Sequence, residues 1–147
     1  MYLFEFVEKL KNIQMRHQTK LVSYDATALF PSVKIKDALK HIQNLLETDT
    51  TIPESTKMTL KDIIGLIDTC FSSSNFTYDE HHHTTNDSGP IGLLLMVTVS
   101  QIWMIYTMEE AIKVAKSRGC IIPRNIFIYM DDCFCTVADP PLRPGGV

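Results

Sequence analysis

The chain has 147 residues, of which 45% are hydrophobic and 21% charged. This length and composition suit one globular domain with a buried core and exclude a disordered, collagen-like or disulfide-framework protein. Lys and Arg (14) are outnumbered by Asp and Glu (17), so the net charge of −3 gives no support to a generally basic nucleic-acid binder. Four cysteines and the lack of a signal-like N-terminus predict an intracellular protein, nuclear or cytoplasmic and not secreted.

The first half of the chain predicts a helix, a strand and two further helices. Apolar residues recur at helical spacing over residues 2–16 and predict an amphipathic helix. Residues 21–25 are rich in strand formers and predict a short strand that ends in the carboxylate of Asp25. One helix is predicted from Ile35 to Leu46, and another opens at Pro53 and continues to Phe71.

The second half begins with a polar segment and then turns strongly apolar. Residues 72–90 predict a loop or a short hairpin, and His81–His83 within it favour a polar loop over a zinc site. Residues 91–108 carry no charge, which makes them long enough to consider as a membrane span. Their polar members, such as Gln101, favour a helix buried in a domain, and we expect no membrane partner. Residues 138–147 predict an unstructured tail because Pro and Gly dominate them.

Two adjacent acids, Asp131 and Asp132, interrupt an apolar stretch that predicts two short strands over residues 125–137. A solvated turn is one explanation, because Asp is common in turns. A divalent metal site is the other, because neighbouring carboxylates repel one another and Mg²⁺ binds carboxylate oxygens. Asp25 also ends a strand, so these acids can share a metal pair suited to phosphoryl transfer if the two strand regions are neighbours in one sheet.

Two other groups of residues keep simpler explanations. Cys133 and Cys135 lack a second Cys or His pair at zinc-ligand spacing, and small buried hydrophobic residues are the favoured interpretation. Lys34, Lys36 and Lys40 either form the solvated face of a helix or contact backbone phosphate, and the solvated face is favoured.

Three segments, in order, resemble the motifs of reverse transcriptases. Residues 23–33 (Ser-Tyr-Asp-Ala-Thr-Ala-Leu-Phe-Pro-Ser-Val) resemble motif A, and residues 89–92 (Gly-Pro-Ile-Gly), which lead into the uncharged helix, resemble motif B. Residues 126–134, which include Tyr-Met-Asp-Asp, resemble the motif C hairpin. The resemblance covers residues 5–137. The long helical insert between motifs A and B is similar to that of retrotransposon enzymes of the Penelope-like or a related non-viral type.

This resemblance implies an α+β fold, the polymerase palm, in which a small antiparallel sheet with a motif C β-hairpin is backed by helices. The palm would span residues 21–137, preceded by an N-terminal helix in residues 1–20 and followed by a disordered tail. The implied activity is that of an RNA-directed DNA polymerase, with nucleotidyl transfer to a primer 3′-hydroxyl by two Mg²⁺ or Mn²⁺ ions. The implied partners are an RNA or DNA template with its primer and deoxynucleoside triphosphates.

Motif by motif, the resemblance also implies roles for single residues. Asp25 and Asp131 would be the principal metal-binding catalytic carboxylates, with Asp132 a supporting acid. Phe30 matches a steric gate against a ribose 2′-hydroxyl, with a plain core phenylalanine as the equal alternative. The residues implied in nucleotide or template binding are Ala26, Phe30, Gly89, Gly92, Tyr129 and Met130.

The chain also departs from the family's pattern. Leu93–Leu95 replace a stretch that is usually small and contains Pro, no basic fingers strands are recognisable before Asp25, and no thumb follows Val137. We therefore expect little or no processive synthesis by this chain alone. The alternative hypothesis is a non-catalytic palm, domesticated or decaying, that acts as a nucleic-acid-binding or protein-interaction module.

Overall fold

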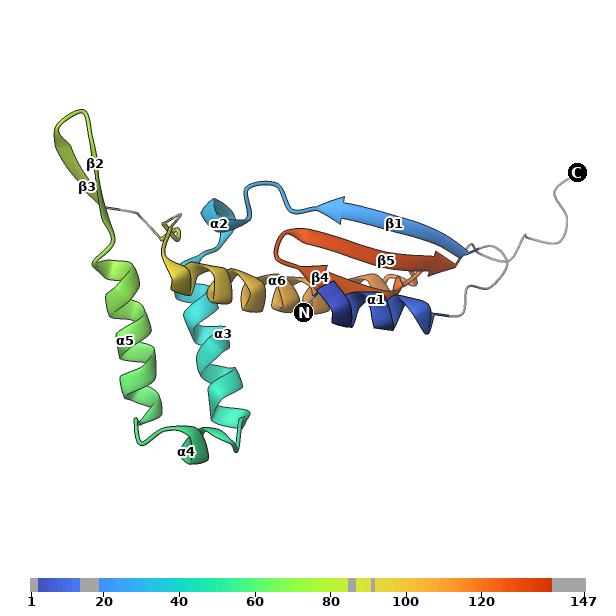
Figure 1. Ribbon diagram of the computed structural model, residues 1–147, viewed down its shortest axis with the longest axis horizontal. Coiled ribbons are helices and arrows are strands. Elements are labelled where there is room, and N and C mark those ends of the chain that lie inside the picture. The colour runs from blue at the N-terminus through green and yellow to red at the C-terminus, as the bar shows by residue number, and fades with distance from the viewer. Residues whose placement is uncertain (1–2, 14–18, 85–86, 91, 139–147) are drawn as a thin grey trace, which may run out of the picture. The chain divides into compact units, whose positions relative to one another are not determined.

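A computed structural model describes residues 3–13, 19–84, 87–90 and 92–138 (Figure 1). Over these ranges the chain is a mixed α+β protein with two small antiparallel sheets. It divides into two compact units, a first unit of Met1–Thr27 with Thr107–Val147 and a second unit of Ala28–Tyr106. The elements are α1 (Leu3–Lys11), β1 (Thr19–Asp25), α2 (Leu29–Ser32), α3 (Ile35–Thr48), α4 (Ile52–Ser55), α5 (Leu60–Ser72), β2 (Asn75–Tyr78), β3 (His81–Thr84), α6 (Leu94–Ser117), β4 (Arg124–Tyr129) and β5 (Asp132–Ala138).

The first unit is built on a three-stranded antiparallel sheet in the order β1-β5-β4. β5 is the central strand, and β1 pairs with it along its whole length, from Thr19 opposite Ala138 to Asp25 opposite Asp132. The strand that ends in Asp25 and the late hairpin are therefore neighbours in one sheet, which is the condition that the sequence set for a shared carboxylate site. The predicted strand at residues 21–25 is confirmed and begins two residues earlier.

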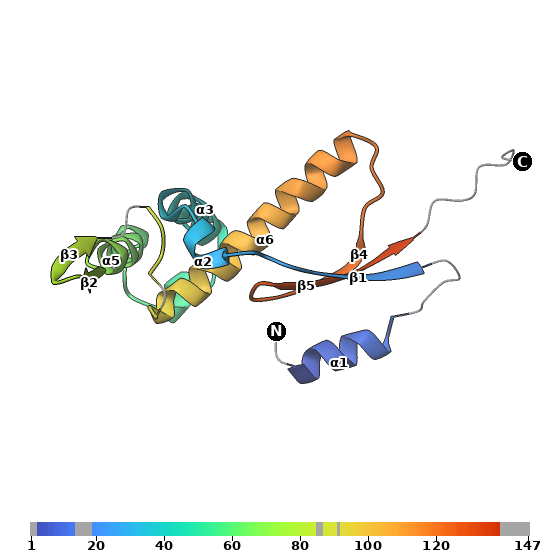
Figure 2. The same cartoon turned by 90° about the horizontal axis from the view of Figure 1, so that it is seen from above.

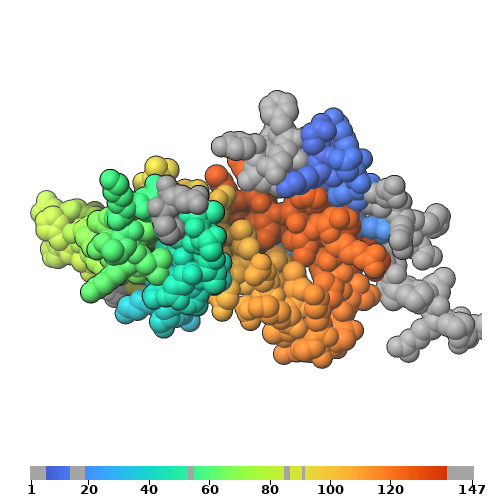
Figure 3. Space-filling model, turned by 90° about the horizontal axis from the view of Figure 1, so that it is seen from below, coloured from blue at the N-terminus to red at the C-terminus, as the bar shows by residue number. Residues whose placement is uncertain are grey.

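Helices of the first unit cover both faces of this sheet (Figure 2). On one face, the ring of Phe6 in α1 meets Phe127 and Phe134 edge to face, with centroids 5.3 and 5.9 Å apart. Figure 3 shows the atoms of α1, in blue, against the red atoms of the hairpin. On the other face, the Tyr24 hydroxyl donates to the Met108 sulfur in α6 at 3.4 Å. The sheet is thus packed between two helical segments.

Successive side chains of the central strand β5 point to opposite faces of the sheet, as expected for a β-strand. Phe134 faces α1, whereas Cys133 and Cys135 point to the opposite face and are only 1% exposed. Both thiols are free, so the interpretation of these cysteines as small buried hydrophobic residues is confirmed. The buried hydroxyl of Thr136 is satisfied by donating to the Arg124 carbonyl at 2.9 Å.

The second unit is helical around one apolar core. One face of α3 supplies most of it, as the spacing between Ile35 and Leu46 predicts, and α5 and the first half of α6 complete it. The short helix α2 follows Ala28, whose backbone is left-handed with φ 53°. The buried members of the core are Val33, Ile35, Ala38, Leu39, Ile42, Phe71, Met96 and Val99.

The prediction of a single helix from Pro53 to Phe71 is wrong about where the helix begins. The structure has a separate short helix, α4, and starts α5 only after Thr59. The reason is a reciprocal cap: Thr59 Oγ1 accepts a bond from the Asp62 amide at 3.2 Å, and the Asp62 carboxylate accepts one from the Thr59 amide at 3.1 Å. Hydrogen bonds from the Thr59 hydroxyl and amide also lower the pKa of Asp62.

Residues 72–90 contain the hairpin of β2 and β3, the second of the two possibilities that the sequence left open. The polar loop favoured for His81–His83 is wrong, because these residues form β3. The strand is supported by cross-strand pairing of rings, with Phe76 stacked on His83 at 5.2 Å. Asp79 and Glu80 both have positive φ, the conformation that a two-residue hairpin turn requires.

The uncharged segment forms most of α6, which is longer than predicted and ends at Ser117. Its buried side chains include Met96, Val99 and Met104. In the part of the chain that the structure describes, no helix is long and apolar enough to cross a membrane. The predictions that fall on residues 1–2, 14–18 and the tail from residue 139 lie outside the described residues.

Candidate functional site

The pairing of β1 with β5 brings two of the three predicted catalytic acids face to face. Asp25 ends β1, Asp132 begins β5, and the two residues are direct partners in the ladder. Directly opposed residues point to the same face of a sheet, with Cβ atoms about 4.5–5.5 Å apart. Both residues are exposed. Two like charges in this arrangement cost stability unless a cation lies between them.

The third acid, Asp131, lies in the turn that joins β4 to β5. Its carbonyl oxygen accepts a hydrogen bond from the Ala26 amide at 2.9 Å, which ties the turn to the residue after Asp25. Next to it, Met130 has a left-handed backbone with φ 54°, an uncommon conformation for a side chain of this kind. Such strain often accompanies functional sites. The chain therefore holds all three acids at one end of the sheet.

The donor chemistry at this end suits a hard divalent cation. Within the described ranges, no hydrogen bond or ion pair engages the carboxylates of Asp25, Asp131 or Asp132, so their oxygens are available as ligands. The strand register brings together two carboxylates, those of Asp25 and Asp132. Over the same ranges, no set of three or more His, Cys, Asp or Glu side chains is close enough to hold a metal ion. The acids match Mg²⁺ or Mn²⁺ by ligand type.

Groups on the opposite face of the sheet, beneath the acids, are held neutral. Burial raises the pKa of Cys133 and outweighs a hydrogen bond with Tyr24 that lowers it; the charges of Cys135, Asp132 and Asp25 act in the same direction as burial. Burial and the two neighbouring thiols raise the pKa of Tyr24 to about 12. The negative charge at this end of the sheet is thus confined to the carboxylates at neutral pH.

Tyr129 and Met130 lie beside these acids in the β4–β5 hairpin. Tyr129 pairs with Asp132, and its side chain is 50% exposed. Met130 is 38% exposed. Both large side chains are open to solvent at the carboxylate end, where the resemblance expects a primer end to lie.

The motif B-like residues and Phe30 belong to the second unit, where two of them line one cavity. Phe30 and Gly92 line a mostly apolar cavity of about 240 Å³ together with Pro90 and residues of the first turn of α6. Phe30 also packs against the apolar core, so both of its proposed roles, steric gate and core residue, are compatible with its position. Gly92 has φ +105°, a conformation that favours glycine.

Gly89 is buried and does not line that cavity. A Cβ atom at this position would overlap the sulfur of Met96, whose side chain fills the space beside the Gly89 backbone. A larger residue here would force the Met96 side chain to move, so glycine suits the packing of α6. This finding gives Gly89 a structural role that the sequence did not indicate.

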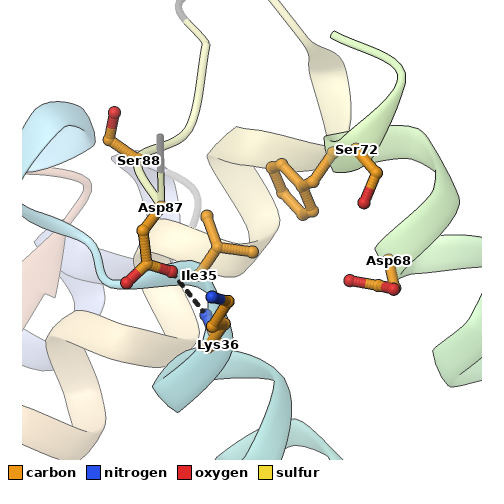
Figure 4. A pocket seen from close by; sticks show the side chains of 7 residues that line it. Ile35, Lys36, Asp68, Ser72, Asp87 and Ser88 are labelled. Carbon is orange, nitrogen blue, oxygen red and sulfur yellow. Dashed lines mark hydrogen bonds between the residues drawn. The ribbon is translucent and has the colours of Figure 1, made fainter. Parts of the chain in front are cut away.

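Sequence reasoning also missed Asp87, which holds the motif B-like loop to the start of α3. Its carboxylate accepts a hydrogen bond from the Lys36 amide at 3.3 Å (Figure 4). Its carbonyl accepts one from the Ile35 amide at 3.2 Å. These bonds satisfy two of the amides at the N-terminus of α3, which has no cap from its own Lys34. Asp87 lines a cavity of about 390 Å³, and Asp68 of α5 lies across from it.

Comparison with known proteins assigns no family to the chain. No protein-family model and no curated protein matches it. Its function is therefore inferred from its own residues and their geometry.

Proposed function

We propose that this chain is the palm core of a reverse transcriptase-like RNA-directed DNA polymerase. It would join a deoxynucleotide to a primer 3′-hydroxyl on an RNA or DNA template. The observation that supports this most strongly is the pairing of Asp25 with Asp132, reinforced by the hydrogen bond from Ala26 to Asp131. The segments that resemble motifs A and C lie far apart in the sequence. They meet at one end of a single sheet.

In this proposal Asp25 and Asp131 hold two Mg²⁺ or Mn²⁺ ions, and Asp132 supports them. When bound, such ions stabilise the attacking and leaving oxygens of a phosphoryl transfer. The chain itself contributes the positions of the acids: the ladder pairs Asp25 with Asp132, and the hydrogen bond from the Ala26 amide to the Asp131 carbonyl ties Asp131 to the same end of the sheet. The opposed charges of Asp25 and Asp132 favour cation binding because a cation removes their repulsion.

Residues of the second unit would contact nucleotide or template. Phe30 is the proposed steric gate, because its ring lines a cavity and does not lie wholly within the core. Gly92 lines the same cavity, and its lack of a side chain leaves the backbone accessible to a ligand. The finding at Gly89 assigns that residue to packing, so we do not include it among the contact residues.

The test is addition of a single nucleotide to an annealed primer by the full chain at high protein concentration with Mn²⁺. We expect addition of one or a few deoxynucleotides by the wild type and none by Asp131→Asn, because the amide cannot replace a charged metal ligand. Asp79→Asn is the matched control. It removes an exposed carboxylate from the β2–β3 turn, where Asn tolerates the left-handed backbone, and it should retain activity.

Equal addition by Asp131→Asn and the wild type would contradict the catalytic role of this acid. No addition by the wild type, with the fold intact, would contradict catalysis by this chain and favour the non-catalytic palm.

A further inference from the structure

A second candidate site lies between α3 and α6, wholly within the second unit. It is a cavity of about 280 Å³. Four of its residues are spaced i, i+3, i+4 and i+7 along α3 and so form one stripe, and the other two are three apart on α6. The lining residues are Asp37, Lys40, His41, Asn44, Trp103 and Tyr106.

Three aromatic rings make a continuous surface in this cavity. Tyr106 lies between the other two, with its ring centroid 4.2 Å from His41 and 5.4 Å from Trp103. The rings are inclined by only 34° and 41° to Tyr106. All three residues are partly exposed. At 4.2 Å the His41 ring lies over one face of the Tyr106 ring, so a flat ligand ring would stack on the face that remains, next to Trp103. The three rings do not form a box of upright walls around a cation.

Polar groups at the cavity favour an anionic, hydrogen-bonding ligand. Lys40 is 78% exposed and makes only an exposed 3.5 Å ion pair with Asp37, so its ammonium can turn towards a phosphate. The amide of Asn44 and the carboxylate of Asp37 offer hydrogen bonds to the edge of a ring. A lysine at the cavity disfavours a quaternary ammonium ligand, the usual occupant of an aromatic cage.

We propose that this cavity binds an unpaired nucleobase that carries a phosphate, either as a free nucleotide or within a single strand. The base stacks on Trp103 and Tyr106, and Lys40 contacts the phosphate. Stacking on aromatic side chains combined with lysine contacts to the backbone is how proteins hold unpaired nucleotides. The site uses none of the acidic residues at the end of the sheet, so it stands or falls independently of the proposed catalysis.

Trp103 is the only tryptophan of the chain, so its fluorescence reports on this cavity directly. The full chain is titrated with deoxyadenosine monophosphate and, separately, with a short oligodeoxyadenylate. Saturable quenching by either ligand is the expected result. Quenching by the mononucleotide identifies a free-nucleotide site, and quenching by the oligomer alone identifies a single-strand site. No quenching by either ligand would overturn the proposal.

Variants then locate the base by anisotropy of a labelled oligomer or nucleotide. Tyr106→Leu keeps an apolar side chain but removes the central ring, and we expect roughly 5- to 150-fold weaker binding. Lys40→Gln changes only an exposed side chain. It should weaken binding and reduce the salt dependence of the affinity by about 0.7 in the log–log slope. Unchanged binding by Lys40→Gln would overturn the proposal, even if Tyr106→Leu proved unstable.

One further variant separates this site from other surfaces. Tyr78→Leu removes a ring that is 74% exposed on the β2–β3 hairpin, and it should leave binding unchanged. A loss as large as that in Tyr106→Leu would place the base elsewhere and overturn the proposal. Binding without nucleotidyl transfer would contradict only the proposed catalysis.

Discussion

Two residues, one in each unit, show how packing and backbone conformation constrain a single position. Gly89 is the clearest case, because Met96 fills the space that any larger residue at position 89 would need. Met96 is itself 1% exposed and has little room to move. Met130 shows the opposite situation, a large side chain on a left-handed backbone beside the proposed catalytic acids.

We predict that Gly89→Ala destabilises the chain by about 1–3 kcal/mol, because its added methyl group overpacks the core against Met96. Gly65→Ala is the matched control. Gly65 lies within α5, and a methyl group added there would meet no other atom within 4 Å, so alanine should stabilise the helix by about 0.5–1 kcal/mol. Urea unfolding of both variants measures the difference. A stability for Gly89→Ala at or above that of the wild type would show that the packing around Met96 is looser than the structure indicates.

Tyr24 predicts how stability changes at alkaline pH. Burial, followed by the neighbouring thiols, raises its pKa from 10.0 to about 12, so the folded chain holds this proton more tightly than the unfolded chain. The contribution is complete below about pH 10 and is lost as the pH rises towards 12. The unfolding free energy of the wild type should therefore fall relative to that of Tyr24→Phe as the pH rises between these values. A constant difference would contradict the raised pKa.

Elements depend on contacts that are remote in sequence. The start of α3 is capped by Asp87, which lies 51 residues after Lys36, and not by a neighbour. By contrast, α5 is capped locally by Thr59 and Asp62. The first arrangement ties the formation of α3 to the position of the motif B-like loop, so one residue supports two elements.

We predict that Asp87→Ala lowers the stability of the chain by about 0.5–2 kcal/mol, the usual cost of a lost helix cap. The neighbouring substitution Ser88→Ala is the control and should change stability by less, because no hydrogen bond of the Ser88 hydroxyl contributes to this cap. Thermal unfolding followed by circular dichroism compares the two. Equal effects of both substitutions would contradict the capping role.

At the scale of the whole molecule, local sequence patterns predicted the helices and strands better than they predicted which of these elements contact one another. Runs of strand-forming residues were sufficient for β1 and the β4–β5 hairpin, and helical spacing was sufficient for α3, because each pattern lies within its own segment. The pairing of β1 with β5 could not be predicted, because residue spacing does not determine which strands are neighbours. The sequence could only state that a shared carboxylate site requires this pairing. The strand of His81–His83 was missed because its stabilising ring contacts come from the opposite strand.

The candidate site shows the same division between local and remote information. The acids were found from motifs and from their unusual place at strand ends. The need for glycine at position 89 and the cap by Asp87 were not found, because both depend on residues that the fold brings from other elements. The ring platform of His41, Trp103 and Tyr106 was hidden for the same reason.

The central claim is that the carboxylates at the end of the sheet bind divalent metal ions. Paramagnetic broadening by Mn²⁺ in amide NMR spectra of the full chain tests it without requiring catalysis. We expect broadening centred on Ala26 and Asp132 in the wild type, its loss in Asp25→Asn, and its retention in Asp79→Asn. Broadening that is absent from this end of the sheet, or unchanged in Asp25→Asn, would contradict the metal site and the polymerase function built on it.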